Sequence, residues 1–260
     1  MGTWCRIFIR YKGEFVIGQC GKGGYIDEQG VYLLNFLRSR RNILRLKKGL
    51  KHIEYTTDDE ASEWKWKIDE KLRGNEALKN NWNSFCENVT GLPRELQEMN
   101  TSLHPCTGAA ILQLISDSKA KQKVQLVKEL QCTNRFDEDW HYVVDLDRSR
   151  LEVYHDLEPQ HPDHMFFGHY RNESRVPRLN CAYNFGALEG LSEKKFVEYH
   201  EKTRKDGPTL ESTRSLVQSF RIQKQGRLKK PTRTKRGKKE MLLRRLFTKR
   251  NGSGQKELVG

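Results

Sequence analysis

Residues 5–19 read CRIFIRYKGEFVIGQ, and this stretch decides the fold class. Its first seven residues alternate between apolar and polar side chains, which is the pattern of a strand with one buried face. Lys12 and Gly13 interrupt the alternation, and a second strand-like run follows from Glu14. Two such runs around a glycine-containing turn predict a β-hairpin near the start of the chain.

A second hairpin is predicted between Trp140 and Tyr154, where two apolar runs enclose a polar turn at residues 147–150. Residues 123–130 and 179–185 are rich in β-forming side chains, so we expect two further strands there. The cysteines on predicted strands, Cys5 and Cys181 among them, are expected to be small buried side chains.

Six segments carry the helical spacing of apolar residues or residues typical of helix caps. They are residues 31–39, 43–50 with Asn42 as N-cap, 58–73, 76–87, the segment after Thr107, and 193–200 with Ser192 as N-cap. Hairpins and helices thus follow one another without the strand–helix–strand rhythm of a doubly wound sheet. The sequence therefore predicts a single α+β globular domain with β-hairpins and interspersed helices.

The charges divide the chain into two parts. The 260 residues carry a formal net charge of +14. Residues 1–200 hold 29 basic and 29 acidic side chains, whereas residues 201–260 hold 19 basic and 5 acidic ones. Apolar residues are also scarce near the C-terminus, so that part cannot bury a core. We expect a globular domain over residues 1–205 and a basic, largely disordered tail over 206–260.

Several classes of protein are excluded by pattern. No run of 18 apolar residues occurs, which argues against a transmembrane segment, and the N-terminus lacks the apolar stretch of a signal peptide. Six cysteines are scattered without a CxxC pair, as in a chain kept in a reducing compartment. They are Cys5, Cys20, Cys86, Cys106, Cys132 and Cys181. The protein is therefore expected to be intracellular, either nuclear or cytoplasmic.

A dense cationic run in the tail is the strongest functional signal. Eight cations lie in the thirteen residues 227–239, with no acid between them. They are Arg227, Lys229, Lys230, Arg233, Lys235, Arg236, Lys238 and Lys239. Such runs are read by nuclear-import receptors and also attach to nucleic-acid phosphates. The sequence therefore favours a binding module, not an enzyme, that associates with the nucleus or with nucleic acid.

Residues 240–250 form a short amphipathic pattern after this run. Leu242, Leu243, Leu246 and Phe247 share one helical face, and cations occupy the other. A helix of this kind suits an RNA backbone or a calmodulin-like groove, and contact with a membrane surface is a further alternative. Neither the partner's identity nor the oligomeric state follows from this pattern.

Residues 38–51 form a second basic segment, this time within the predicted domain. Seven cations and no acid occur there. They are Arg38, Arg40, Arg41, Arg45, Lys47, Lys48 and Lys51. A helix face of this kind can lie on phosphates. The alternative, which acidic residues 58–60 favour, is an internal and solvated balance of charge.

The glycine-rich residues 21–30 are a candidate ligand loop, with Gly24, Tyr25, Gln29 and Gly30 as its site residues. Clustered glycines let backbone N–H groups approach an anion. A hydrolase- or transferase-type enzyme with a cysteine or histidine in reach is therefore an alternative function. The spacing matches no known phosphate-loop pattern, and no cofactor is expected. A tight connection between hairpin and helix is the competing interpretation.

Residues of this loop, together with the start of the chain, resemble the pattern of a known family. The opening Met-Gly-Thr, the pair Gly24-Tyr25 and the pair Gln29-Gly30 resemble a mostly fungal family without an assigned activity. Its members begin Met-Gly-Thr-Arg and continue, after a hairpin, into Asp-Gly-Tyr-Pro-x-Gly-Gln-Gly. Residues 140–154 are similar to that family's Trp-x-Tyr-Val-x-Asp-Leu-Asp segment. The resemblance implies a shared fold and a fungal source.

This chain differs from that pattern at four positions. Trp4 stands for the usual Arg, Gly23 for Asp, Ile26 for Pro, and Glu28 for Gly. If the family's Arg and Asp form a functional pair, this chain lacks both members of it. The resemblance then implies a divergent paralogue.

Four histidines, His155, His161, His164 and His169, cluster in residues 155–169 together with three carboxylates. Imidazole and carboxylate groups are ligands for zinc-like ions, which makes a metal-binding module a third alternative. Two prolines place the segment in a predicted loop, and no HExxH motif is present. A solvated loop is the competing interpretation.

Overall fold

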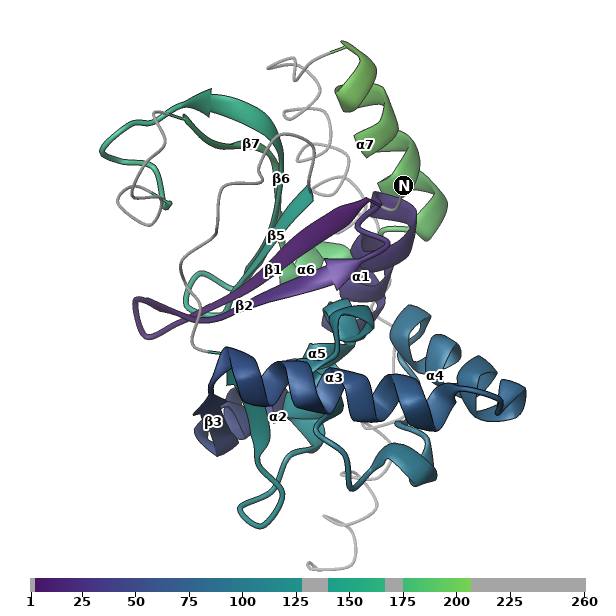
Figure 1. Ribbon diagram of the computed structural model, residues 1–260. Coiled ribbons are helices and arrows are strands. Elements are labelled where there is room, and N and C mark those ends of the chain that lie inside the picture. The colour runs from purple at the N-terminus through teal and green to yellow at the C-terminus, as the bar shows by residue number, and fades with distance from the viewer. Residues whose placement is uncertain (1–2, 128–139, 167–174, 207–260) are drawn as a thin grey trace, which may run out of the picture. The chain divides into compact units, whose positions relative to one another are not determined.

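The structure is a computed structural model that describes residues 3–127, 140–166 and 175–206 (Figure 1). All of these residues belong to one compact unit. Strands and helices alternate irregularly along it, so the predicted α+β class is confirmed. No helix in these ranges is long and apolar enough to cross a membrane.

A five-stranded mixed sheet organises the unit, with strand order β2-β1-β5-β6-β7. Its strands are β1 Trp4–Tyr11, β2 Glu14–Lys22, β5 Trp140–Asp145, β6 Arg150–Pro159 and β7 Arg175–Asn184. Both predicted hairpins are confirmed, since β1 pairs antiparallel with β2 and β5 with β6. The two hairpins join through a parallel pairing of β1 with β5.

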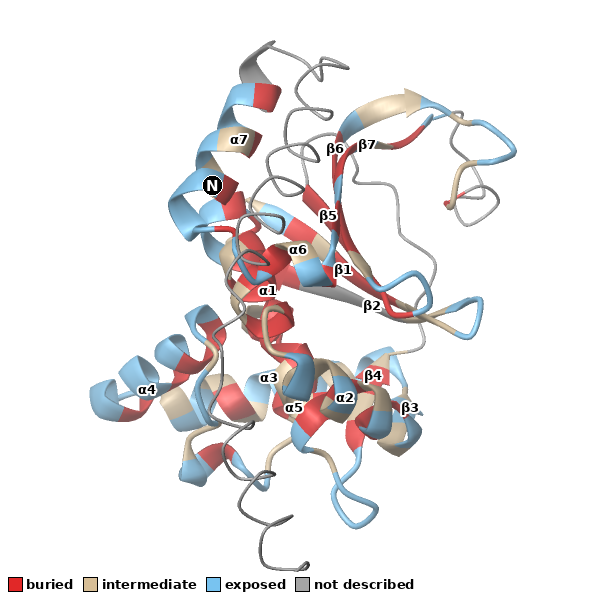
Figure 2. Cartoon of the chain, turned by 180° about the vertical axis from the view of Figure 1, so that it is seen from behind, coloured by how far each residue is buried: buried red, intermediate tan, exposed pale blue. Residues whose placement is uncertain are grey.

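The two faces of this sheet bury different side chains, as strand alternation requires. β5 is buried along its whole length (Figure 2). On one face, Phe8, Val143 and Tyr154 form an apolar core with Phe166 and Val176. The opposite face buries a second set of side chains, which packs against helices. This set includes Cys5, Ile7, Tyr142, Leu151, Val153 and Cys181.

Three helices lie on that second face, and a π-helical turn leads into the first of them. They are α1 Val31–Leu37, α6 Phe185–Leu188 and α7 Glu193–Asp206, preceded by the turn Ile26–Gly30. Phe196 of α7 packs on Tyr183 of β7, with ring centroids 5.4 Å apart. The Ser192 side chain accepts a hydrogen bond from the Lys195 N–H, which confirms the predicted cap of α7.

The remaining helices pack around a small parallel sheet. They are α2 Arg40–Gly49, α3 Asp58–Leu72, α4 Glu76–Glu87 and α5 Ile111–Asp117, and the sheet pairs β3 Ile53–Thr56 with β4 Val124–Val127. Short 3-10 turns connect them, at Leu50–His52, Arg94–Leu96, Thr101–Leu103 and Pro105–Ala110. The last of these turns contacts β2, so it links this group of helices to the main sheet.

Two predicted helix caps are wrong. α2 begins at Arg40, and its N-cap is Ser39, whose side chain accepts a hydrogen bond from the Asn42 N–H. Asn42 therefore lies inside the first turn. Thr107 lies within a 3-10 turn, where its hydroxyl donates to the Thr101 carbonyl, and α5 starts only at Ile111. Both residues are cap formers by type, but Ser39 occupies the capping position of α2, and α5 begins after Ala110 without a side-chain cap.

The strands also differ in extent from the prediction. β7 begins at Arg175, not at residue 179, and Phe185 already belongs to α6. β6 continues to Pro159, so residues 155–159 form a strand where a loop was expected. β3 was not predicted at all, because its partner β4 lies about 70 residues away and fixes it by pairing.

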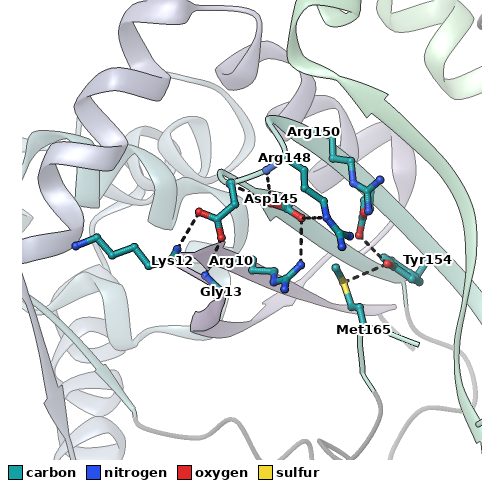
Figure 3. Close-up of polar contacts among 10 residues, drawn as sticks. Arg10, Lys12, Gly13, Asp145, Arg148, Arg150, Tyr154 and Met165 are labelled. Atoms are coloured by element: carbon teal, nitrogen blue, oxygen red, sulfur yellow. Dashed lines mark hydrogen bonds and ion pairs between the residues drawn. The ribbon is translucent and has the colours of Figure 1, made fainter. Parts of the chain in front are cut away.

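A carboxylate ties the tips of the two hairpins together. Asp147 accepts hydrogen bonds from the backbone N–H groups of Lys12 at 2.9 Å and Gly13 at 2.8 Å. Lys12 and Gly13 both have positive φ, so the turn exposes these two N–H groups on one side. The hairpin tips are thereby held side by side at one end of the sheet (Figure 3).

Candidate functional site

The basic segment 38–51 forms α2 and the turns beside it. α2 packs on α5 so closely that a β-carbon on Gly49 would overlap the Ile115 carbonyl. Leu46 is fully buried in the same contact region. This packing fixes which side of α2 faces the protein, and it leaves the opposite side to solvent.

Three of the seven cations bind to the protein itself. Arg38 donates to the Asn35 side chain at 2.6 Å and to the Leu191 carbonyl. Arg45 forms an ion pair with Asp117 on α5. The Lys47 ammonium donates to the Leu146 carbonyl at 2.9 Å. Arg38 also lies 3.8 Å from the Glu193 carboxylate, so the predicted internal balance of charge is confirmed for Arg38 and Arg45.

The other four cations, Arg40, Arg41, Lys48 and Lys51, point to solvent. None of them has an ion-pair partner within the described ranges. Arg40, Arg41 and Lys48 each lie three or four residues from the half-exposed Leu44, so these three share one side of α2. Lys51 follows in the 3-10 turn Leu50–His52. We name this set the α2 basic face. Arg40 and Arg41 are about 1.5 Å apart along the helix axis, and Lys48 follows about 10 Å further along it.

α2 lies next to the hairpin tips. Lys47 contacts Leu146 at the end of β5, and the Leu146 N–H donates to the Arg10 carbonyl at 2.9 Å. Arg148 in the following turn is exposed. Exposed cations therefore occur both on α2 and in the turn after β5, and the cations of both can contact phosphates.

The predicted ligand loop is mostly internal. Gly24, Gln29 and Gly30 are buried, whereas Tyr25 is 40 % exposed. A β-carbon on Gly24 would overlap the backbone of Trp4, and one on Gly30 would overlap the Ile26 side chain.

The partners of this loop are groups of the protein. The Gln29 side-chain carbonyl accepts a hydrogen bond from the Ala109 N–H at 2.6 Å, and the Tyr142 hydroxyl donates to the Gly24 carbonyl at 3.1 Å. Gly23 alone of the loop glycines has a positive φ, of 71°. These contacts are those of a tight hairpin-to-helix connection. The glycine spacing was visible in the sequence, but the backbone approach that explains it was not.

The histidine segment does not form a single cluster in the described residues. His155 is buried on β6 and lies 2.7 Å from the Asp156 carboxylate, whereas His161 is exposed. His164 lies 3.4 Å from Glu158. Within the described ranges no three histidine, cysteine or acidic side chains are placed to hold a metal ion. His169 lies outside those ranges, so the metal-binding alternative stays a prediction.

One cysteine and one histidine approach the same tyrosine in the interior. The Tyr183 hydroxyl lies 2.9 Å from Nε2 of His200 and forms a hydrogen bond with the Cys181 thiol. Burial raises the pKa of Cys181 to about 11 and lowers the pKa of His200 to about 3. A neutral thiol and a neutral imidazole in the core are poor nucleophilic machinery.

A cleft of about 980 Å³ lies among the described residues. It is lined mainly by residues 97–102 and 117–125. Its described lining contains several lysines and amides but neither a histidine nor a cysteine. The cleft therefore does not coincide with any of the predicted sites.

The tail cations at 227–239 and the segment 240–250 lie outside the described residues. Comparison with models of protein families, with curated proteins and with solved structures found no match. The resemblance to a fungal family therefore stays a prediction.

Proposed function

We propose that this protein is a non-enzymatic intracellular binding module that associates with nucleic acid through the α2 basic face and the tail cations. The α2 basic face is the observation that carries the proposal. Three exposed cations share one side of α2 and a fourth lies in the turn that follows it, and the described part of the chain gives them no acidic partner. An unpaired row of this kind is available for phosphate contacts.

Binding of this type is driven by release of counterions from the phosphate backbone, so it depends on salt and not on base sequence. The exposed side of α2 presents Leu44 but no aromatic residue that could stack on a base. We therefore expect contacts to phosphates of duplex and single-stranded nucleic acid alike, with Kd values on the order of 10⁻⁴ to 10⁻⁶ M at physiological salt.

We also propose that the tail run 227–239 directs the protein to the nucleus. Eight cations within thirteen residues match the composition that nuclear-import receptors bind. Replacing all eight by Gln in the full-length chain should abolish nuclear accumulation of a fluorescent fusion. Unchanged accumulation of that variant would exclude the tail run as the import signal.

The α2 basic face is tested by the salt dependence of binding to a DNA duplex. We expect the quadruple variant Arg40→Gln, Arg41→Gln, Lys48→Gln and Lys51→Gln to reduce the slope of log K against log salt by about 3 to 4, because each phosphate contact contributes about 0.9.

The matched control removes four exposed cations elsewhere, through Lys71→Gln, Arg73→Gln, Arg94→Gln and Lys121→Gln. It should leave the slope unchanged. An equal loss in both variants would show that overall charge, and not the α2 basic face, binds the duplex.

A further inference from the structure

Three arginines and two buried carboxylates meet where the sheet ends at the hairpin tips. Arg10, Asp145 and Arg150 are direct register partners across β1, β5 and β6, so their side chains share one face of the sheet. Val143 and Glu152 form the next row on that face. The side chains of Asp145 and Glu152 are both fully buried.

Asp145 positions two of the arginines. One of its oxygens accepts backbone hydrogen bonds from the N–H groups of Asp147 at 3.0 Å and Arg148 at 2.8 Å. Its other oxygen, Oδ2, lies 3.6 Å from Nη1 of Arg10 and 3.9 Å from Nε of Arg148 (Figure 3). Two guanidinium groups, one from a strand and one from the turn, therefore face the same carboxylate oxygen.

Glu152 positions the third arginine. Its Oε1 forms an ion pair with Arg150, and its Oε2 accepts a hydrogen bond from the Tyr154 hydroxyl at 2.6 Å. The Tyr154 hydroxyl also lies 3.2 Å from the Met165 sulfur (Figure 3). The carboxylate is thus held from two sides, which limits the positions open to the Arg150 guanidinium.

The cluster keeps unused hydrogen-bonding capacity on its outer side. The three guanidinium groups face two buried carboxylates, and the third carboxylate nearby, that of Asp147, is bound to the backbone N–H groups of Lys12 and Gly13. The separations of 3.6 and 3.9 Å between Asp145 and its arginines exceed hydrogen-bonding distance. Each guanidinium carries five N–H donors. The side chains of Arg10, Arg148 and Arg150 are 25 %, 53 % and 29 % exposed, so solvent reaches them.

We propose that Arg10, Arg148 and Arg150 form a binding site for a phosphate group. A phosphate has several strong acceptor oxygens, and the planar fork of a guanidinium matches two of them at once. Glu152 holds Arg150 in place, and the charge of Asp145 attracts Arg10 and Arg148 to the same region, so the three guanidinium groups are close together before the ligand arrives. The site goes beyond the proposed function, since a single phosphate needs no polymer and no contact with α2.

The test is a titration of the full-length protein with inorganic phosphate, at an ionic strength kept constant with sodium chloride. Isothermal calorimetry should show saturable binding to the wild type. Arg148→Gln should weaken it at least tenfold, because that exposed side chain supplies outward donors without taking part in the buried contacts of Glu152. Arg94→Gln, an exposed arginine outside this cluster, should bind phosphate like the wild type.

Arg148→Lys keeps the charge but loses the fork, so it should bind phosphate more weakly than the wild type and more tightly than Arg148→Gln. Circular dichroism confirms that each variant is folded. Absence of binding to the wild type overturns the proposal, as does equal binding by wild type and Arg148→Gln.

Two oligonucleotides distinguish the sources of the phosphate group. If the ligand carries a terminal phosphate, a 5′-phosphorylated strand should bind more tightly than its 5′-hydroxyl form, and Arg148→Gln should remove that difference. Equal affinity of the two strands, with competition by inorganic phosphate, identifies a backbone phosphodiester. Failure of the α2 salt test leaves the titration with inorganic phosphate unaffected, so the two proposals fail separately.

Discussion

Burial determines the protonation state of individual side chains in this protein, and His200 is the clearest case. His200 lies in the core against Tyr183, Trp140 and Phe196, and its Nε2 is 2.9 Å from the Tyr183 hydroxyl. Burial, assisted by the neighbouring His155, lowers its pKa to about 3. The imidazole is therefore neutral in the folded state over the whole physiological range of pH, whereas the unfolded chain takes up a proton near pH 6.5.

This difference predicts the dependence of stability on pH. Between about pH 6.5 and pH 3 the unfolded state binds a proton at His200 that the folded state does not bind, so the free energy of unfolding falls on acidification. The slope from this one group reaches about 1.4 kcal/mol per pH unit. His200→Gln should flatten the fall in urea midpoint between pH 7 and pH 5. An unchanged pH dependence in this variant would place its origin elsewhere.

Gly24 tests whether the glycine loop is a packing element. Gly24→Ala places a β-carbon against the backbone of Trp4, and we expect a loss of about 1–3 kcal/mol because backbone cannot move aside cheaply. The control is Gly91→Ala, since a β-carbon there meets nothing within 4 Å. Thermal unfolding of the two variants measures the difference. Equal melting temperatures of the two variants would contradict the packing role of Gly24 and favour a ligand-binding role for the loop.

At the scale of helices and strands, sequence patterns predicted correctly those elements that depend on residues close together in the chain. The hairpin at residues 4–22 is confirmed because alternation and turn lie within one short stretch, and the Ser192 cap of α7 needs only the next three residues. The prediction that Thr107 caps α5 is wrong, because the Thr107 hydroxyl donates a hydrogen bond to the Thr101 carbonyl. β3 was missed because pairing with β4, not its own composition, makes it a strand.

The joined hairpin tips give an element-scale prediction. The hydrogen bond from the Gly13 N–H, together with that from Lys12, lowers the pKa of Asp147. Asp147→Ala removes both acceptors and should lower the free energy of unfolding by about 1 kcal/mol, a value kept small because the site is exposed. Asp163→Ala, whose side chain is 93 % exposed, should change it by less than about 0.5 kcal/mol. Equal effects would show that the tips do not need this carboxylate.

For the molecule as a whole, the balanced charge of residues 1–200 does not imply a balanced surface. Acids and bases cancel in number there, yet four exposed cations lie on α2 and the turn that follows it, and three arginines meet at the hairpin tips. The sequence shows the basic run 38–51, but only packing against α5 separates its inward cations from its outward ones. The arginine cluster was not predicted, because Arg10 and Arg150 are brought together by the parallel pairing of β1 with β5.

Nucleic-acid binding by the α2 basic face is measured most directly as the affinity of the full-length protein for a DNA duplex as a function of salt. The wild type, the quadruple α2 variant and the quadruple control variant are compared under identical conditions. We expect the slope of log K against log salt to fall by about 3 to 4 in the α2 variant alone. Equal slopes for all three proteins would contradict it.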